Sequence, residues 1–167
     1  MPSADEAARI DPDFAEAHGD LGAVLGKQGR WADCAAAHRR ALELLPGQLE
    51  ATYNLGVALM MLEDFEGAEP YLRRITELTP EDPDAWYRHG VVLAQLSRCA
   101  EALDSFERTL SQDPDHEEAH AMAARELVHF DRKGEARDHL ARAMALRPQL
   151  FDEWEELADL WHEVCGA

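Results

Sequence analysis

Residues 83–116 read PDAWYRHGVVLAQLSRCAEALDSFERTLSQDPDH, and this stretch decides the fold. Its second half places Ala102, Leu103, Phe106 and Leu110 at the spacing of one face of an α-helix. Its first half is also helical in pattern, and a short polar segment at 97–99 separates the two halves. The stretch therefore predicts a pair of helices joined by a tight turn.

The same pattern recurs along the chain at an unbroken interval. Proline returns every 34 residues, at Pro12, Pro46, Pro80, Pro114 and Pro148. Small residues return at what we call the notch position, which holds Gly22, Gly56, Gly90 and Ala124. Larger side chains return at the knob position, which holds His38, Leu72, Phe106 and Leu140. Self-similarity at this period is the signature of a repeat protein, whose stacked units bury a shared core.

The pattern closely resembles the tetratricopeptide repeat family, whose unit of about 34 residues has Leu-Gly in the first helix and Pro after the second. Leu21-Gly22, Leu55-Gly56, Trp86 with Gly90, and Phe106 match that family's motif. The resemblance implies an all-α, right-handed superhelical solenoid of antiparallel helix pairs. It divides the chain into four full repeats at 15–48, 49–82, 83–116 and 117–150.

Both ends of the chain are expected to hold incomplete repeats. Residues 1–10 are interpreted as the end of a preceding repeat's second helix, which would leave an open N-terminal edge suited to self-association. Residues 151–165 are interpreted as a C-terminal capping helix or a truncated fifth repeat, with Trp154, Leu157, Ala158 and Trp161 on one stripe. Inside the second repeat, Pro70 predicts an irregular first turn of the second helix.

Composition excludes several classes of partner. The 167 residues include 16 Lys plus Arg and 34 Asp plus Glu, a formal net charge of −18, which argues against a nucleic-acid surface. No apolar run approaches the ~18 residues that span a bilayer, and Asp5 and Glu6 lie where a signal peptide would be apolar. We therefore expect no membrane partner. Three widely spaced cysteines favour a reducing, cytoplasmic setting.

The acidity itself has two interpretations. Lys27 and Lys133 are the only lysines, and an acidic, lysine-poor surface can keep a protein hydrated in concentrated salt. The alternative is an acidic surface that meets a basic partner. The salt interpretation is favoured because the acidic residues are spread along the whole chain rather than blocked.

One short motif could carry zinc chemistry. His116-Glu117-Glu118-Ala119-His120 matches the HExxH pattern, in which two histidines bind zinc and the glutamate acts as a base. In register, however, His116 falls in a turn between repeats and His120 at a core position, and no third ligand is singled out. Two other pairs are likewise interpreted as structural: Cys34 with His38, and His162 with Cys165. We predict no catalytic residue, no metal site and no cofactor.

Repeated polar positions have structural interpretations as well. Four histidines at core positions, His18, His38, His89 and His120, are expected to be buried and neutral. Burial would lower their pKa, so stability should fall as the pH drops below about 6.5. A row of arginines at Arg40, Arg74, Arg108 and Arg142 is expected to form surface ion pairs with neighbours such as Glu43 and Glu77.

The resemblance also suggests where a partner would bind. In this family the first helices line the concave side of the superhelix. First-helix positions that are not needed for packing carry an apolar and aromatic stripe here, so the predicted peptide-binding residues are Tyr53, Asn54, Val57, Met60, Tyr87, Arg88, Val91 and Arg125. An extended or helical peptide with apolar side chains would suit this stripe, with Asn54 and Arg88 fixing its orientation.

These patterns favour a non-enzymatic scaffold that binds a protein or peptide segment in a concave groove. The alternative is a regulatory or substrate-presenting array within a larger enzyme such as a transferase. A metallohydrolase built on residues 116–120 is the third and least favoured interpretation.

Overall fold

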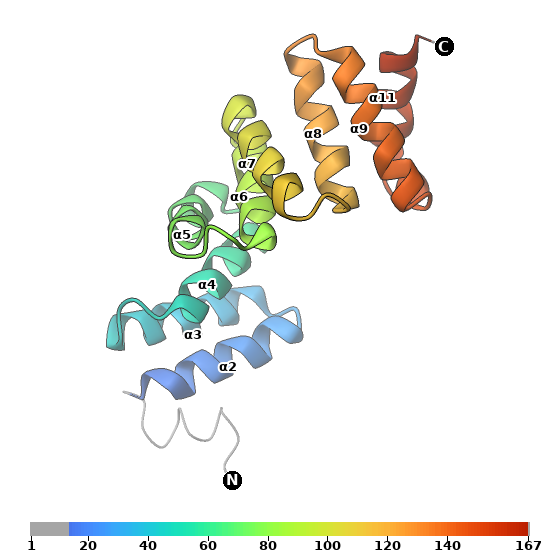
Figure 1. The fold of residues 1–167 in the computed structure, drawn as a ribbon. Helices are drawn as coiled ribbons and strands as arrows, with labels where there is room; N and C mark the ends of the chain where they lie inside the picture. Colours follow the sequence, from blue (N-terminus) through green and yellow to red (C-terminus); the bar gives the residue numbers. More distant parts are fainter. Residues whose placement is uncertain (1–13, 167) are drawn as a thin grey trace. The chain divides into compact units, whose positions relative to one another are not determined.

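The structure is a computed structural model that describes residues 14–166, and these residues contain helices and no strands (Figure 1). The chain divides between Thr79 and Pro80 into two compact units. The first contains α2 (Ala15–Lys27), α3 (Trp31–Leu44), α4 (Leu49–Met61) and α5 (Phe65–Leu78). The second contains α6 (Pro83–Gln95), α7 (Cys99–Gln112), α8 (Glu117–His129), α9 (Lys133–Leu146), α10 (Leu150–Glu153) and α11 (Glu155–Cys165). The predicted all-α fold of helix pairs is confirmed. The segment 1–10 lies outside the described residues.

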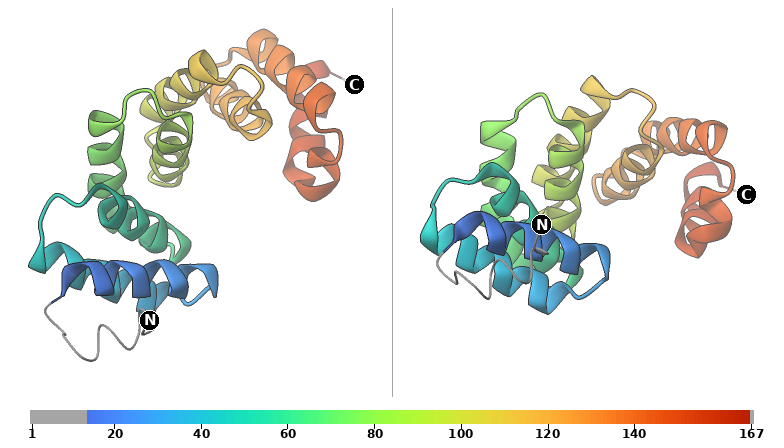
Figure 2. Two further views of the ribbon diagram at one scale, coloured as in Figure 1. Left: turned by 60° about the horizontal axis from the view of Figure 1, so that its bottom comes forward. Right: turned by 90° about the horizontal axis from the view of Figure 1, so that it is seen from below.

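Each helix packs against the next one along the chain within its unit, as α2 with α3 and α8 with α9 (Figure 2). The notch and knob positions explain how closely the two helices of a pair approach. A Cβ added at Gly90 would lie 2.7 Å from Cε1 of Phe106, and one added at Gly56 would lie 2.9 Å from Cγ of Leu72. Because no side chain fits between these residues, the glycines persist although glycine inside a helix costs about 0.5–1 kcal/mol relative to alanine.

The turn inside each helix pair has the same backbone conformation. Gly29, Glu63, Ser97 and Asp131 occupy equivalent positions and have φ angles of 72°, 60°, 59° and 58°. In every turn the following amide bonds back across the helix end, as Arg30 N–H does to the Leu25 carbonyl at 3.0 Å and Asp64 N–H to the Leu59 carbonyl at 3.0 Å. This is the Schellman arrangement, which ends a helix through one left-handed residue.

Helix α5 is regular, so the predicted irregularity at Pro70 is wrong. The helix runs without a break from Phe65 to Leu78 with Pro70 inside it. The Asp64 side chain accepts a hydrogen bond from the Gly67 amide at 3.1 Å and caps the first turn. Pro70 is exposed; it lacks the amide that would bond to the carbonyl four residues earlier and its ring crowds that carbonyl, and the capped helix tolerates both effects.

The C-terminal segment is two helices rather than the expected continuous one. Trp154 has φ −119° and ψ 90°, and this extended residue separates α10 from α11. Leu150 is fully buried and anchors α10 to the preceding pair. The break changes the phase of α11, so Leu157 is buried, Leu160 and Val164 pack beside it, and Ala158 is exposed. The predicted apolar stripe is therefore corrected at Ala158.

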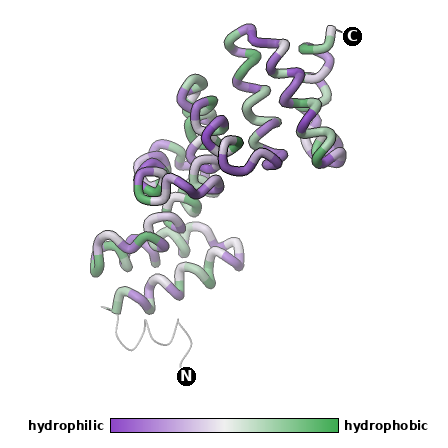
Figure 3. The backbone as a smooth tube through the Cα atoms, viewed as in Figure 1, coloured by the Kyte–Doolittle hydropathy of each residue, from purple (hydrophilic) through white to green (hydrophobic). Residues whose placement is uncertain are grey.

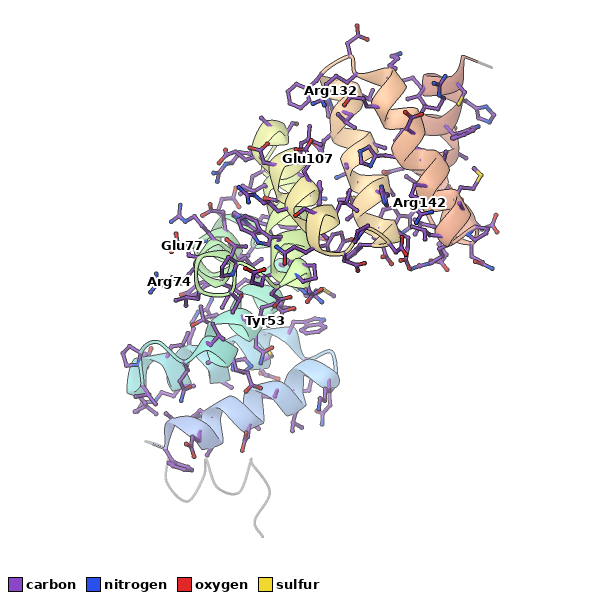
Figure 4. All side chains as sticks on the ribbon, viewed as in Figure 1. Tyr53, Arg74, Glu77, Glu107, Arg132 and Arg142 are labelled. Atoms are coloured by element: carbon purple, nitrogen blue, oxygen red, sulfur yellow. The ribbon has the colours of Figure 1, made fainter. Side chains whose placement is uncertain are left out.

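Two of the four arginines in the row form the predicted ion pairs with a neighbour on the same helix. Arg40 pairs with Glu43 at 3.2 Å and Arg74 with Glu77 at 3.1 Å, and the second pair is labelled in Figure 4. The two remaining members make other contacts: Arg108 lies 5.8 Å from the Trp86 ring centroid, and Arg142 pairs with Asp115.

Apolar and polar residues are mixed along each helix (Figure 3). Within the described residues, no helix has both the length and the apolar character needed to cross a bilayer.

Candidate functional site

A cavity of about 880 Å³ lies within the second unit. Its walls come from α6, α8 and the α10–α11 segment, and α8 contacts both α6 and α11. The lining residues are Tyr87, Val91, Ala121, Met122, Arg125, Glu153, Trp154, Glu155, Glu156, Leu157, Asp159, Leu160 and Glu163. Cavities of ~300–1,000 Å³ are typical of ligand sites in proteins.

Helical spacing places the residues that line this cavity on shared helix faces, and most of those named here are apolar or aromatic. Tyr87 and Val91 are four residues apart on α6, and Met122 and Arg125 are three apart on α8, so each pair shares one helix face. Leu157 and Leu160 do the same on α11. The result is an apolar floor between the helices.

Tyr87 joins the cavity to the core of the second unit. Its ring centroid lies 6.1 Å from that of Phe106 and 4.6 Å from that of His116. Burial of the phenol, with the Glu118 carboxylate nearby, raises the pKa of Tyr87 to about 12. Tyr87 therefore stays protonated near neutral pH and can donate a hydrogen bond to a ligand in the cavity.

Carboxylates surround the cavity. Arg125 is the one lysine or arginine among the lining residues. Five lining residues are acidic: Glu153, Glu155, Glu156, Asp159 and Glu163. Glu153 pairs with Arg147, and Glu163 pairs with Lys133 at 3.2 Å. Within residues 14–166, no cation pairs with the other three carboxylates. The rim therefore carries uncompensated negative charge.

Arg147 holds α10 at the edge of the cavity. Its guanidinium binds Glu117 at 3.3 Å and also contacts Glu118 and Glu153. These carboxylates raise the pKa of Arg147 above its usual range, led by the hydrogen bond that Arg147 donates to Glu153. The start of α8 and the short helix α10 are joined in this way.

The predicted site residues are divided between the two units. Tyr87, Val91 and Arg125 line the cavity together, whereas Arg88 donates a hydrogen bond to Asp84 at 2.9 Å. The other four lie half-exposed on α4: Tyr53, which is labelled in Figure 4, with Asn54, Val57 and Met60. Sequence reasoning missed the wall contributed by α10 and α11. The signal for it was an apolar stripe flanked by acidic residues, in a segment interpreted as a capping helix or a truncated fifth repeat and not as part of a binding site.

The HExxH residues are engaged in other contacts. The Nδ1 atom of His116 accepts a hydrogen bond from the Ala119 amide at 3.2 Å and caps α8. The Nε2 atom of His120 lies 3.0 Å from the Pro114 carbonyl, and its Nδ1 lies 2.8 Å from Nδ1 of His139. Because a carbonyl only accepts, His120 carries its proton on Nε2 and accepts from His139 at Nδ1 when neutral. The two histidines of the motif make different contacts, so their ring nitrogens do not face one common metal position.

The Cys34–His38 pair is buried, as its repeat positions predict. Cys34 is 2% exposed and His38 is 1% exposed. Burial raises the pKa of the Cys34 thiol and lowers the pKa of His38, so both groups favour their neutral forms. A buried neutral thiol is a poor nucleophile. On the last helix, His162 is exposed and Cys165 half-buried.

The fold matches a known family and several solved structures. A model for the tetratricopeptide repeat matches residues 20–83, 61–117 and 87–151. The crystal structure of YrrB, described as a TPR protein with an unusual peptide-binding site, has a TM-score of 0.80 and 28% identity, covering 87% of this chain and 75% of that one. MamA from Desulfovibrio magneticus RS-1 has a TM-score of 0.81 and 21% identity, covering 87% of this chain and 82% of that one. MamA AMB-1 has a TM-score of 0.74 and 26% identity, covering 80% and 73%. No curated protein sequence matches the chain.

The chain belongs to the tetratricopeptide repeat family and has its solenoid fold of helix pairs. Proteins of this class are generally non-catalytic scaffolds for protein–protein interaction.

Proposed function

We propose that this protein binds a peptide segment of a partner protein in the cavity of the second unit. The segment combines apolar side chains, which enter the floor, with Lys or Arg, which meets the acidic rim. The observation that carries the proposal is one cavity in which aromatic and aliphatic side chains are surrounded by five carboxylates, three of which form no ion pair with the described residues.

The floor has the residue types that interfaces favour. Tyr87, Met122 and Trp154 are half-buried or buried residues that still line the cavity. Tyr, Trp and Met are enriched at binding surfaces because they offer large contact areas. Burial of apolar area contributes about 25 cal/mol per Å², so a few side chains entering this floor would supply much of the affinity.

The rim selects the charge of the partner. Glu155, Glu156 and Asp159 form no ion pair with the described residues, and the chain as a whole carries a formal net charge of −18. An acidic peptide would be repelled, while a basic one would be attracted over a distance of about one Debye length, ~8–10 Å in moderate salt. Arg125 can bind a carbonyl or carboxylate of the segment and set its direction.

The likeness to YrrB supports a peptide ligand. That protein is described as having a peptide-binding site, and this chain is 28% identical to it over 87% of its own length. The predicted residues on α4 belong to the first unit, where Tyr53 and Val57 would offer apolar contacts to a peptide. Peptide binding in the cavity of the second unit does not require these α4 residues.

The test is selection of ligands from a library of random displayed peptides, followed by fluorescence anisotropy with a labelled peptide. We expect the selected sequences to be rich in Lys or Arg beside apolar residues. Reversing two rim charges, Glu156→Lys with Asp159→Lys, should weaken binding on the order of tenfold, because opposite charges become like charges. Both residues are exposed, so the fold should be retained.

The matched control reverses two exposed acidic residues on the outer side of α7, Asp104→Lys with Glu107→Lys. This control changes the net charge equally and should leave binding almost unchanged. Selected peptides that are acidic, or that bind the rim variant as tightly as the control, would refute the proposal. Tyr53→Ala tests the first unit by itself: unchanged affinity would confine the site to the second.

A further inference from the structure

Three side chains of metal-ligand type meet on α7 and α8, away from the HExxH motif. One ligand atom each of Cys99, Glu126 and His129 lies within 4.8 Å of the other two. Within the described part of the chain, no other group of three His, Cys, Asp or Glu meets in this way. The HExxH histidines are not in the cluster.

The topology of the helix pairs explains how the cluster forms. Cys99 is the first residue of α7, and His129 is the last residue of α8. The two helices pack together and are joined by a short turn, so the start of α7 lies beside the end of α8. Glu126 and His129 are three residues apart and therefore share the face of α8 that meets Cys99.

Glu126 is the unusual member of the cluster. The equivalent position in the other repeats holds Val24, Ala58 and Val92. The Glu126 side chain is 3% exposed, and among residues 14–166 its cation partner is Arg125, which lies 3.3 Å away through Nε and is itself half-exposed. Burying a carboxylate is unfavourable unless strong partners compensate for its lost hydration. A packing role alone would be met better by the apolar residue that the other repeats carry.

We propose that Cys99, Glu126 and His129 form a binding site for a zinc ion, with Sγ, a carboxylate oxygen and an imidazole nitrogen as ligands. Thiolate and imidazole together select zinc over magnesium or calcium, which prefer oxygen ligands. On binding, the S–H bond of Cys99 breaks, an S–Zn bond forms and the proton passes to solvent. Three protein ligands leave a fourth position for water, which the exposed side at His129 can supply.

Arg125 connects this site with the peptide cavity. Its Nε donates to Oε1 of Glu126, and its side chain lines the cavity wall. With zinc on the other carboxylate oxygen, Arg125 would hold Glu126 in place as an outer-shell residue. The zinc site does not depend on the proposed peptide binding, because its three ligands lie outside the cavity lining.

The test uses the full chain, stripped of metal with a chelator and then titrated with ZnCl2 and, separately, CoCl2. We expect one zinc per chain by metal analysis after desalting. Cobalt should give the intense visible absorption of a tetrahedral ion and a thiolate charge-transfer band. Zinc should also raise the melting temperature, since it binds the native state.

Three variants remove one ligand each: Cys99→Ser, Glu126→Gln and His129→Ala. Loss of an outer-shell partner typically weakens metal binding by about 10–100-fold, so loss of a ligand should cost at least about tenfold. His129 is exposed, so its alanine variant should fold normally and is the decisive one. The charge-transfer band should vanish in Cys99→Ser alone among the three.

Matched controls remove the same residue types elsewhere, with Cys165→Ser and His162→Ala on the last helix and His120→Ala in the HExxH motif. These variants should keep full zinc affinity. Absence of zinc binding by the wild type, or wild-type affinity in both Cys99→Ser and His129→Ala, would overturn the assignment. Loss of zinc binding only in the His162 or Cys165 variant would place the metal on α11, and this result would also overturn the assignment.

Discussion

At the scale of single residues, the spacing of each helix pair depends on the absence of a side chain at the notch. Gly90 lies against the ring of Phe106, which is fully buried. The structure thus separates two effects of glycine: it weakens the helix locally, and it permits the tertiary contact.

Gly90→Ala should lower the free energy of unfolding by up to about 2 kcal/mol, the overpacking cost of about 1–3 kcal/mol less the gain in helix propensity. The new Cβ would lie 2.7 Å from Phe106, and strain of this kind exceeds the ~1 kcal/mol gained in helix propensity. The control is Gly19→Ala on α2, where no atom lies within 4 Å of the added Cβ, so stability should rise slightly. Urea unfolding measures both. A stabilised Gly90→Ala protein would show that the notch is not required.

Acid should destabilise the protein through its histidines. Burial lowers the pKa of His38, His120 and His139, and mutual repulsion adds to the effect at His139. Each folded pKa lies below the unfolded value of about 6.5, so the unfolded chain binds more protons between the two values. Stability is therefore complete above about pH 6.5 and falls as the pH drops through the folded pKa values.

The measurement is urea unfolding at about pH 7.5 and 5.5, values that bracket the unfolded pKa of about 6.5. A double variant, His120→Asn with His139→Asn, should lose less stability over the same interval.

The charged groups that face this pair are His116, Asp115, Arg132, Glu135, Asp138 and Arg142. The pKa of Glu135 is lowered by Arg132, so this carboxylate titrates below the interval. Equal stability of the wild type at both pH values would contradict the role of the buried histidines.

At the scale of helices, α5 tolerates a proline that its repeat position does not need. Pro70→Ala should raise the free energy of unfolding by about 1–3 kcal/mol, because alanine restores one amide hydrogen bond and relieves the ring contact. The reciprocal change is Ala36→Pro, at the equivalent exposed position of α3, which should destabilise by a similar amount. Urea unfolding midpoints of the two variants measure this, and an unchanged midpoint in Pro70→Ala would show that Pro70 does not weaken α5.

The helix pairs could be predicted from sequence because notch and knob residues recur at one interval. The cavity was predictable only in part: Tyr87, Val91 and Arg125 follow from their places in first helices. Its other wall depends on the extended backbone at Trp154, which sets the phase of α11 and has no repeat to reveal it. Glu126 is a polar residue at a position that is apolar in the other repeats, but only the packing of α7 on α8 places it beside Cys99.

At the scale of the whole molecule, the net charge of −18 predicts a response to salt. KCl shortens the Debye length from about 10 Å at 0.1 M to about 3 Å at 1 M and so screens repulsion among the carboxylates. The melting temperature should therefore rise with KCl, while affinity for a basic peptide should fall. A flat melting temperature would contradict adaptation of the surface to salt. If the affinity for the peptide does not fall as KCl rises, the peptide does not bind through the charges of the acidic rim.

The four left-handed turns limit how the length of this protein can change. Each turn closes through one residue and two hydrogen bonds, so an added or deleted residue there cannot be absorbed locally. The helix that follows would be rotated by about 100°, the angle per residue of an α-helix, and would carry Leu72 or Phe106 away from its glycine. Insertions and deletions in the coding sequence should therefore be tolerated only as whole repeats, which makes the repeat itself the unit of genetic change.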